Sequence, residues 1–199
     1  MLIEILSAVS LGFIAYISTN VDNLFLLITF RADPSFENSQ LLLGYFFGTI
    51  ILLILMVAFS FTRSLIPFQS LELLGLVPLA MGLKKLFDLF LKKGYTASKP
   101  TAVSKSGWQF LTLTTVLIAN SGDTITVFAP LLMESKIPVM IILCLTFLLM
   151  AAILYLAGSR MLKHLTTVDF IQRYGHYIVP FAMMAIGLYI LNNTSTDLI

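Results

Sequence analysis

The chain has 199 residues, of which 58% are hydrophobic and only 11% are charged, and its mean hydropathy is +0.96. Soluble domains carry charge on about a quarter of their residues, so this composition excludes an ordinary soluble protein and predicts an integral membrane protein. The net charge of +2 is too small to indicate a nucleic-acid partner. The single cysteine, Cys144, excludes a disulfide framework or a thiolate metal cluster within one chain.

Six apolar stretches reach the length of about 20 residues that a membrane-spanning helix needs. The sequence lacks the alternation of a membrane barrel, so we expect an all-α fold with six transmembrane helices in one domain, residues 1–199. In chain order the predicted spans are Leu6–Phe30, Leu41–Phe61, Leu71–Leu91, Phe110–Leu132, Val139–Gly158 and Tyr177–Leu191.

The first predicted span contains a polar segment that runs from Ser18 to Asn23 and includes Asp22. Asp22 stands nine positions before Arg31, which is about 13 Å along an ideal helix and places the carboxylate near the midplane. A charged carboxylate costs at least about 2.5–3.5 kcal/mol at this depth. We therefore expect either that Asp22 has a functional role or that it forms a hydrogen bond that holds two helices together.

The fourth predicted span repeats the pattern, with Asn120 shortly before Asp123. Asp123 stands eleven positions before Glu134, about 16 Å along an ideal helix, and is measured from the opposite membrane surface. Both carboxylates are thus expected near the midplane, where inverted symmetry would bring them face to face. Two aspartates at equivalent positions favour a functional site over two unrelated helix ties.

The third and sixth spans also match, since Val77-Pro78 in one corresponds to Val179-Pro180 in the other. Matches in the same order predict two repeats, at about 1–92 and about 108–193, joined by a linker at about 93–107. Each repeat has an odd number of spans, so the second must enter the membrane inverted, as in many secondary transporters.

The basic residues predict the orientation of the chain in the membrane, because cytoplasmic connections are enriched in Lys and Arg. With the first, third and fifth connections in the cytoplasm, ten basic residues lie on that side and two on the other, and both termini are extracytoplasmic. The ten are Arg31, Lys84, Lys85, Lys92, Lys93, Lys99, Lys105, Arg160, Lys163 and Arg173, and the two are Arg63 and Lys136.

Both polar motifs surround their aspartate with amide and hydroxyl oxygens. Serine and asparagine compete for backbone hydrogen bonds and glycine adds flexibility, so we expect a local break in the helix at both motifs. Carboxylates beside unwound carbonyls suit a hard or borderline divalent cation. Hydrogen bonds that merely tie helices together remain the alternative for each side chain. The predicted metal site consists of Asp22, Asp123, Asn20, Asn23, Asn120 and Thr124.

These motifs resemble those of the cadmium-resistance transporters of the CadD type, in the LysE-like exporter superfamily. The resemblance covers nearly the whole chain in order. It implies efflux of a divalent metal cation across a bacterial plasma (inner) membrane, in exchange for protons or another cation, with the central site on the first and fourth spans. The matching stretches are 19–27, 43–48, 74–78, 118–123 and 187–190.

The chain departs from this family at one point, because no cysteine precedes Asp123 where cadmium exporters can carry one. Cadmium favours thiolate ligands, whereas oxygen ligands favour a harder ion. We therefore expect Mn²⁺ or Cd²⁺ as the transported ion, with a preference for Mn²⁺ and with Zn²⁺ still open.

Two other functions remain open on the sequence alone. A carboxylate pair could bind the ammonium group of an amino acid or another small organic cation, and a basic membrane protein could serve as a non-transporting scaffold subunit. The spans contain no hydrolase-type catalytic arrangement and no phosphate-binding loop, so we expect neither an enzyme nor a bound cofactor. The expected partners are the lipid bilayer and the metal ion, and a homodimer is left open.

Overall fold

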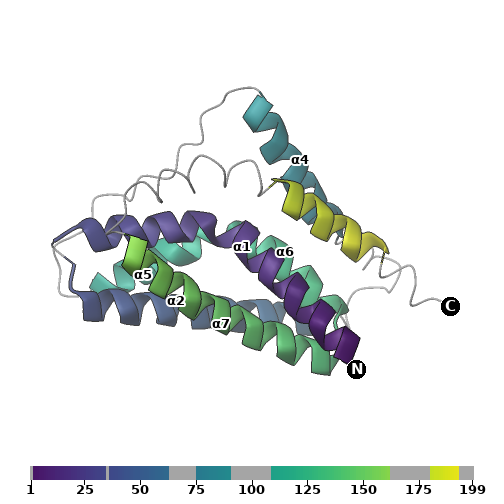
Figure 1. The fold of residues 1–199 in the computed structure, drawn as a ribbon, viewed down its shortest axis with the longest axis horizontal. Coiled ribbons are helices and arrows are strands. Elements are labelled where there is room, and N and C mark those ends of the chain that lie inside the picture. The colour runs from purple at the N-terminus through teal and green to yellow at the C-terminus, as the bar shows by residue number, and fades with distance from the viewer. Residues whose placement is uncertain (1, 35, 63–74, 91–108, 162–179, 193–199) are drawn as a thin grey trace.

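The computed structural model describes residues 2–34, 36–62, 75–90, 109–161 and 180–192 (Figure 1). Every regular element within these ranges is a helix, as the composition predicted. The basic linker at 93–107 and most of the fifth connection fall outside the described residues. The helices are α1 (Leu2–Ala32), α2 (Asn38–Ser60), α4 (Leu76–Phe90), α5 (Gln109–Asn120), α6 (Gly122–Glu134), α7 (Ile137–Met161) and a last helix, Pro180–Asn192.

Three helices, α1, α2 and α7, are long and apolar enough to cross a membrane. The pair α5 and α6 passes the same test as one span that is bent by 65°. The predicted first, second and fifth spans therefore correspond to helices of spanning length, and the predicted fourth span corresponds to the bent pair α5 and α6. The described helices at the third and sixth positions are only about 20 Å long, short of a hydrocarbon core of about 30 Å. The arrangement with six spans thus stays a prediction.

Close contacts at two glycines show the relative direction of α1 and α7. A Cβ at Gly12 of α1 would lie 3.2 Å from Thr146 of α7. A Cβ at Gly158 of α7 would lie 3.0 Å from Leu27 of α1. The contact advances along both helices together, so α1 and α7 run parallel, as Figure 1 also shows.

The helices α2 and α5 form a second parallel pair. A Cβ at Gly44 would lie 2.5 Å from the carbonyl oxygen of Phe110, and one at Gly48 would lie 3.2 Å from Leu117. The hydroxyl of Thr114 also donates a hydrogen bond to the carbonyl of Gly44, at 2.9 Å. Only glycine allows these two backbones to approach so closely.

The last helix packs antiparallel on α4. A Cβ at Gly75 would lie 2.7 Å from the carbonyl oxygen of Gly187, and one at Gly82 would lie 2.8 Å from that of Pro180. Later residues of one helix thus meet earlier residues of the other. Close backbone contact at both points holds the position of α4 firmly against the last helix.

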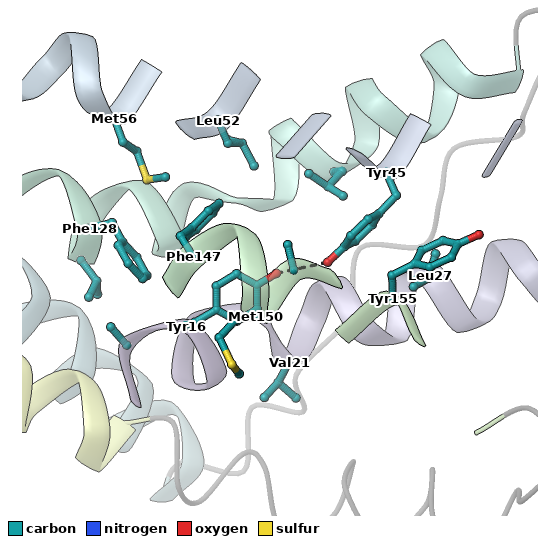
Figure 2. Close-up of a cluster of buried hydrophobic side chains, with 14 of the residues drawn as sticks. Tyr16, Val21, Leu27, Tyr45, Leu52, Met56, Phe128, Phe147, Met150 and Tyr155 are labelled. Carbon is teal, nitrogen blue, oxygen red and sulfur yellow. Dashed lines mark hydrogen bonds between the residues drawn. The ribbon is translucent and has the colours of Figure 1, made fainter. Parts of the chain in front are cut away.

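The buried core lies where α1, α2, α6 and α7 meet (Figure 2). The hydroxyls of Tyr16 and Tyr45 share a hydrogen bond of 3.1 Å at its centre. The ring of Phe147 stands edge-on to both Tyr16 and Phe128, with centroids 5.0 Å apart in each pair. The outer faces of these helices are apolar too, with Ile54 and Leu149 both more than half exposed, which suits contact with lipid.

Candidate cation site

The predicted fourth span is interrupted at Ser121, between α5 and α6, and is called the broken span below. The hydroxyl of Ser121 donates to the carbonyl of Leu117 at 2.7 Å, and its backbone N–H donates to that of Ile118 at 3.1 Å. Both hydrogen bonds go to carbonyls at the C-terminal end of α5, and the side chain of Ser121 does not cap α6. Adjacent glycine and serine are a common cause of sharp kinks, and Gly122 follows immediately. The expected break at the second motif is confirmed.

The break expected at the first motif is wrong, because α1 runs continuously from Leu2 to Ala32. The polar side chains of this motif donate back to carbonyls of the preceding turn. Thr19 donates to Ala15 at 2.8 Å, and Asn20 donates to Tyr16 at 3.1 Å. A helix accommodates such bonds without opening.

Asn23 joins the two motifs, which lie about a hundred residues apart in the sequence. Its amide nitrogen donates to the side-chain oxygen of Asn20 at 2.8 Å and to the hydroxyl of Ser121 at 3.1 Å. Its amide oxygen accepts from the side chain of Asn120 at 3.0 Å. Asn20, Asn23 and Ser121 are at most 3% exposed. Buried amides in one connected network hold α1 against the helix break.

Thr124 adds a second link between the motifs. Its hydroxyl donates to the backbone carbonyl of Thr19 at 3.4 Å, and its side chain is fully buried. Since Asn23 meets Asn120 and Ser121 while Thr19 meets Thr124, α1 and the broken span run antiparallel. The structure thus brings together the four predicted neutral site residues, which are Asn20, Asn23, Asn120 and Thr124.

The two aspartates have different surroundings. Asp123 lies in the first turn of α6, where the positive end of the helix dipole favours a carboxylate. It forms an ion pair with Lys85 of α4, and the two side chains are 18% and 23% exposed. Asp22 lies in the middle of α1, is partly buried and also has an interaction partner. A role for either carboxylate in metal binding stays a prediction.

Two residues at the site, Ser121 and Lys85, are absent from the predicted set. The sequence places Lys85 only among the basic charges that orient the chain. A useful signal was present, because Lys85 falls inside a predicted span. An ionisable group in a span usually has a partner of opposite charge. The sequence could not tell which carboxylate would provide it.

The side-chain atoms at this site that could coordinate a metal ion are mainly oxygens. Within the described ranges, no group of three or more His, Cys, Asp or Glu residues comes close enough to hold a metal. The amide oxygens of Asn20 and Asn23 each accept one N–H bond. A carbonyl oxygen has two lone pairs, so each can still coordinate a cation. Amide, hydroxyl and carboxylate oxygens together suit a hard or borderline divalent ion.

Comparison with known families identifies the chain. No curated protein and no solved structure matches it. The sequence profile of one family, described as cadmium resistance transporter, matches residues 16–199. The matched range contains both polar motifs and the lysine on α4. Because it covers most of the chain, the protein belongs to the cadmium resistance transporter family.

Proposed function

We propose that the protein exports a divalent metal cation through a site between α1 and the break of α5 and α6. The observation that carries the proposal is the contact of the two acidic motifs through Asn23. The family match indicates a metal substrate. The contact through Asn23 is where polar side chains of both motifs meet. Asp22 and Asp123 would supply two negative charges to balance a divalent ion in a medium of low dielectric constant.

The neutral residues would complete the coordination or orient the carboxylates. Asn20, Asn120 and Thr124 offer oxygens at the contact of α1 with the broken span. Asn23 has a different role in this proposal, because its nitrogen and oxygen already join three other side chains. It would act mainly as the clamp that keeps the two halves of the site together.

The directions of the helices support an inverted repeat. In the predicted repeat the first span corresponds to the fourth, and the second corresponds to the fifth. The pair of α1 and α7 therefore corresponds to the pair of the broken span and α2, and both pairs are parallel. The contact of α1 with the broken span, and that of α4 with the last helix, are both antiparallel, as inverted halves require. We infer that the halves move against each other around the site, driven by exchange with protons or another cation.

The ion is expected to be Mn²⁺ in preference to Cd²⁺, because the described donors are oxygens and soft Cd²⁺ favours thiolate. Cys144, on α7, packs against the hydrophobic core. Uptake by inverted membrane vesicles, measured with Mn²⁺, Cd²⁺ and Zn²⁺ in turn and with or without a proton gradient, tests both the ion and the coupling. Faster uptake of Cd²⁺ than of Mn²⁺ would overturn the preference.

The site itself is tested by Asp22→Asn and Asp123→Asn, with Asp33→Asn as the matched control. Asp33 is exposed, just after the end of α1. Each site variant should reduce uptake by at least about tenfold, while the control keeps wild-type uptake. Membrane abundance of every variant is measured alongside. Wild-type uptake in both site variants would sink the proposal.

Export of a small organic cation is the second candidate, and one observation favours it. The carboxylate of Asp123 accepts a hydrogen bond from the primary ammonium group of Lys85 in this structure. An amino acid or amine could bind the same carboxylate. Stabilisation of the purified protein against heat by amines, but not by divalent metals, would favour this candidate over metal export.

A further inference from the structure

Lys85 has no role in the site described so far, although it touches one of the proposed ligands. It reaches Asp123 from α4, and both side chains are mostly buried. Its neighbour Lys84 is exposed. Two adjacent lysines therefore have different environments, and only one of them contacts the candidate site.

The backbone of α4 holds Lys85 in place. Gly82 lies three residues earlier, where a Cβ would be 2.8 Å from both the carbonyl of Pro180 and the side chain of Met184. The helix α4 also packs on α6, which bears Asp123. The ammonium is therefore presented to the carboxylate by a helix that is closely packed on two sides.

Charge balance gives this ion pair a consequence for transport. Without a bound ion, Lys85 neutralises Asp123 and removes the penalty of an isolated charge in the membrane. With a divalent ion bound to Asp123, the same ammonium would face a like charge at close range in a medium of low dielectric constant. The ammonium and a divalent substrate would therefore compete for the carboxylate of Asp123.

We propose that Lys85 is an internal competitor for Asp123, which the transported cation displaces on binding and which reclaims the carboxylate when the cation leaves. The inference rests on the proposed function, because it requires Asp123 to bind the substrate. It assigns Lys85 as the residue that limits affinity and promotes release. An exporter needs both properties, since an ion that binds too tightly is not released.

The test measures binding of Mn²⁺ and of Cd²⁺ to the purified full-length protein in detergent, by titration calorimetry. Lys85→Gln removes the competitor and should tighten binding by about tenfold, while turnover in vesicles falls because release slows. Lys85→Arg keeps a cation and should bind no more tightly than the wild type. Lys84→Gln, at the exposed neighbour, should match the wild type. Structural damage would weaken binding, so tighter binding in Lys85→Gln together with unchanged binding in Lys84→Gln indicates competition at Asp123 and not a general loss of positive charge.

The variants separate failure of this inference from failure of the site. Asp123→Asn should weaken binding of the ion, and unchanged binding there would overturn the proposed function. Weakened binding in Asp123→Asn together with unchanged or weaker binding in Lys85→Gln would overturn the competition alone. Lys85→Met, which keeps the apolar stem, is the second neutral variant. Misfolding of both neutral variants, with Lys84→Gln folded, would show that the pair is structural and would also overturn the inference.

Discussion

The two acidic motifs are similar in sequence but differ in structure. In α1 the helix continues through the motif, whereas the fourth span is interrupted at Ser121 and turns by 65°. The residue that precedes each aspartate differs as well. Val21 is buried in the core and supports the helix, while Gly122 has no atom within 4 Å of the place where a Cβ would be. The first motif therefore lies within a continuous helix, and the second lies at a helix end.

The same difference separates the two carboxylates. Asp123 gains a helix N-terminus and the ammonium of Lys85, so its charge is stabilised twice. Asp22, within a continuous helix, lacks the helix N-terminus. A sequence repeat thus need not produce equal halves of a site, because packing and partners differ on each side.

The largest effect is expected when α1 is made to resemble the broken span. Val21→Gly removes a buried side chain and adds glycine to a helix interior, so the free energy of unfolding should fall by about 3 kcal/mol. Thermal unfolding in detergent measures the change. Val21→Ala, which keeps the helix propensity, should show a smaller loss. Wild-type stability of the glycine variant would mean that the motif does not depend on the helix of α1.

A somewhat smaller effect is expected where a glycine keeps the broken span against α2. In Gly44→Ala the new Cβ would meet the carbonyl of Phe110 at 2.5 Å, which forces the backbones apart. We expect a loss of about 2 kcal/mol in unfolding free energy. An unaltered melting temperature would contradict the close approach of α2 and α5.

The clamp between the motifs is tested by Asn23→Ala. The change removes three side-chain hydrogen bonds and leaves buried partners unsatisfied, so a loss of about 1–2 kcal/mol is expected. Asn120→Ala removes one bond at a partly exposed position and should lose less. Denaturant unfolding of both variants gives the order, and a larger loss for Asn120→Ala would reverse the assignment of Asn23 as the clamp.

The smallest effect is expected at the break itself. Gly122→Ala meets no neighbouring atom, so unfolding free energy should change by less than about 1 kcal/mol and metal uptake should stay near the wild-type rate. The variant also serves as the control for Gly44→Ala. A large loss of uptake in a stable Gly122→Ala protein would mean that the break must flex during transport.

Part of the site could be predicted from sequence, since its oxygen-bearing residues form local clusters that stand out against apolar spans. The contact of Asn23 with Asn120 and Ser121 could be expected only in outline, from the repeat. The partner of Asp123 could not be predicted, because Lys85 comes from a third helix and no local pattern links them. The break at the second motif was predictable from Ser121-Gly122. The same reasoning failed at the first motif, which contains no glycine and through which α1 is continuous.

The amino-acid sequence is enough to predict a helical membrane protein, the places of its long apolar helices, and the polar residues that stand out within them. Composition and local runs of residues decide these properties, because transfer from water to lipid depends on each segment separately. Three properties depend on the folded arrangement: which helix pairs run parallel, which motif is interrupted, and which side chain pairs with Asp123. These outcomes depend on contacts between residues far apart in the chain, where close packing at a few glycines and the pairing of buried charges select one arrangement.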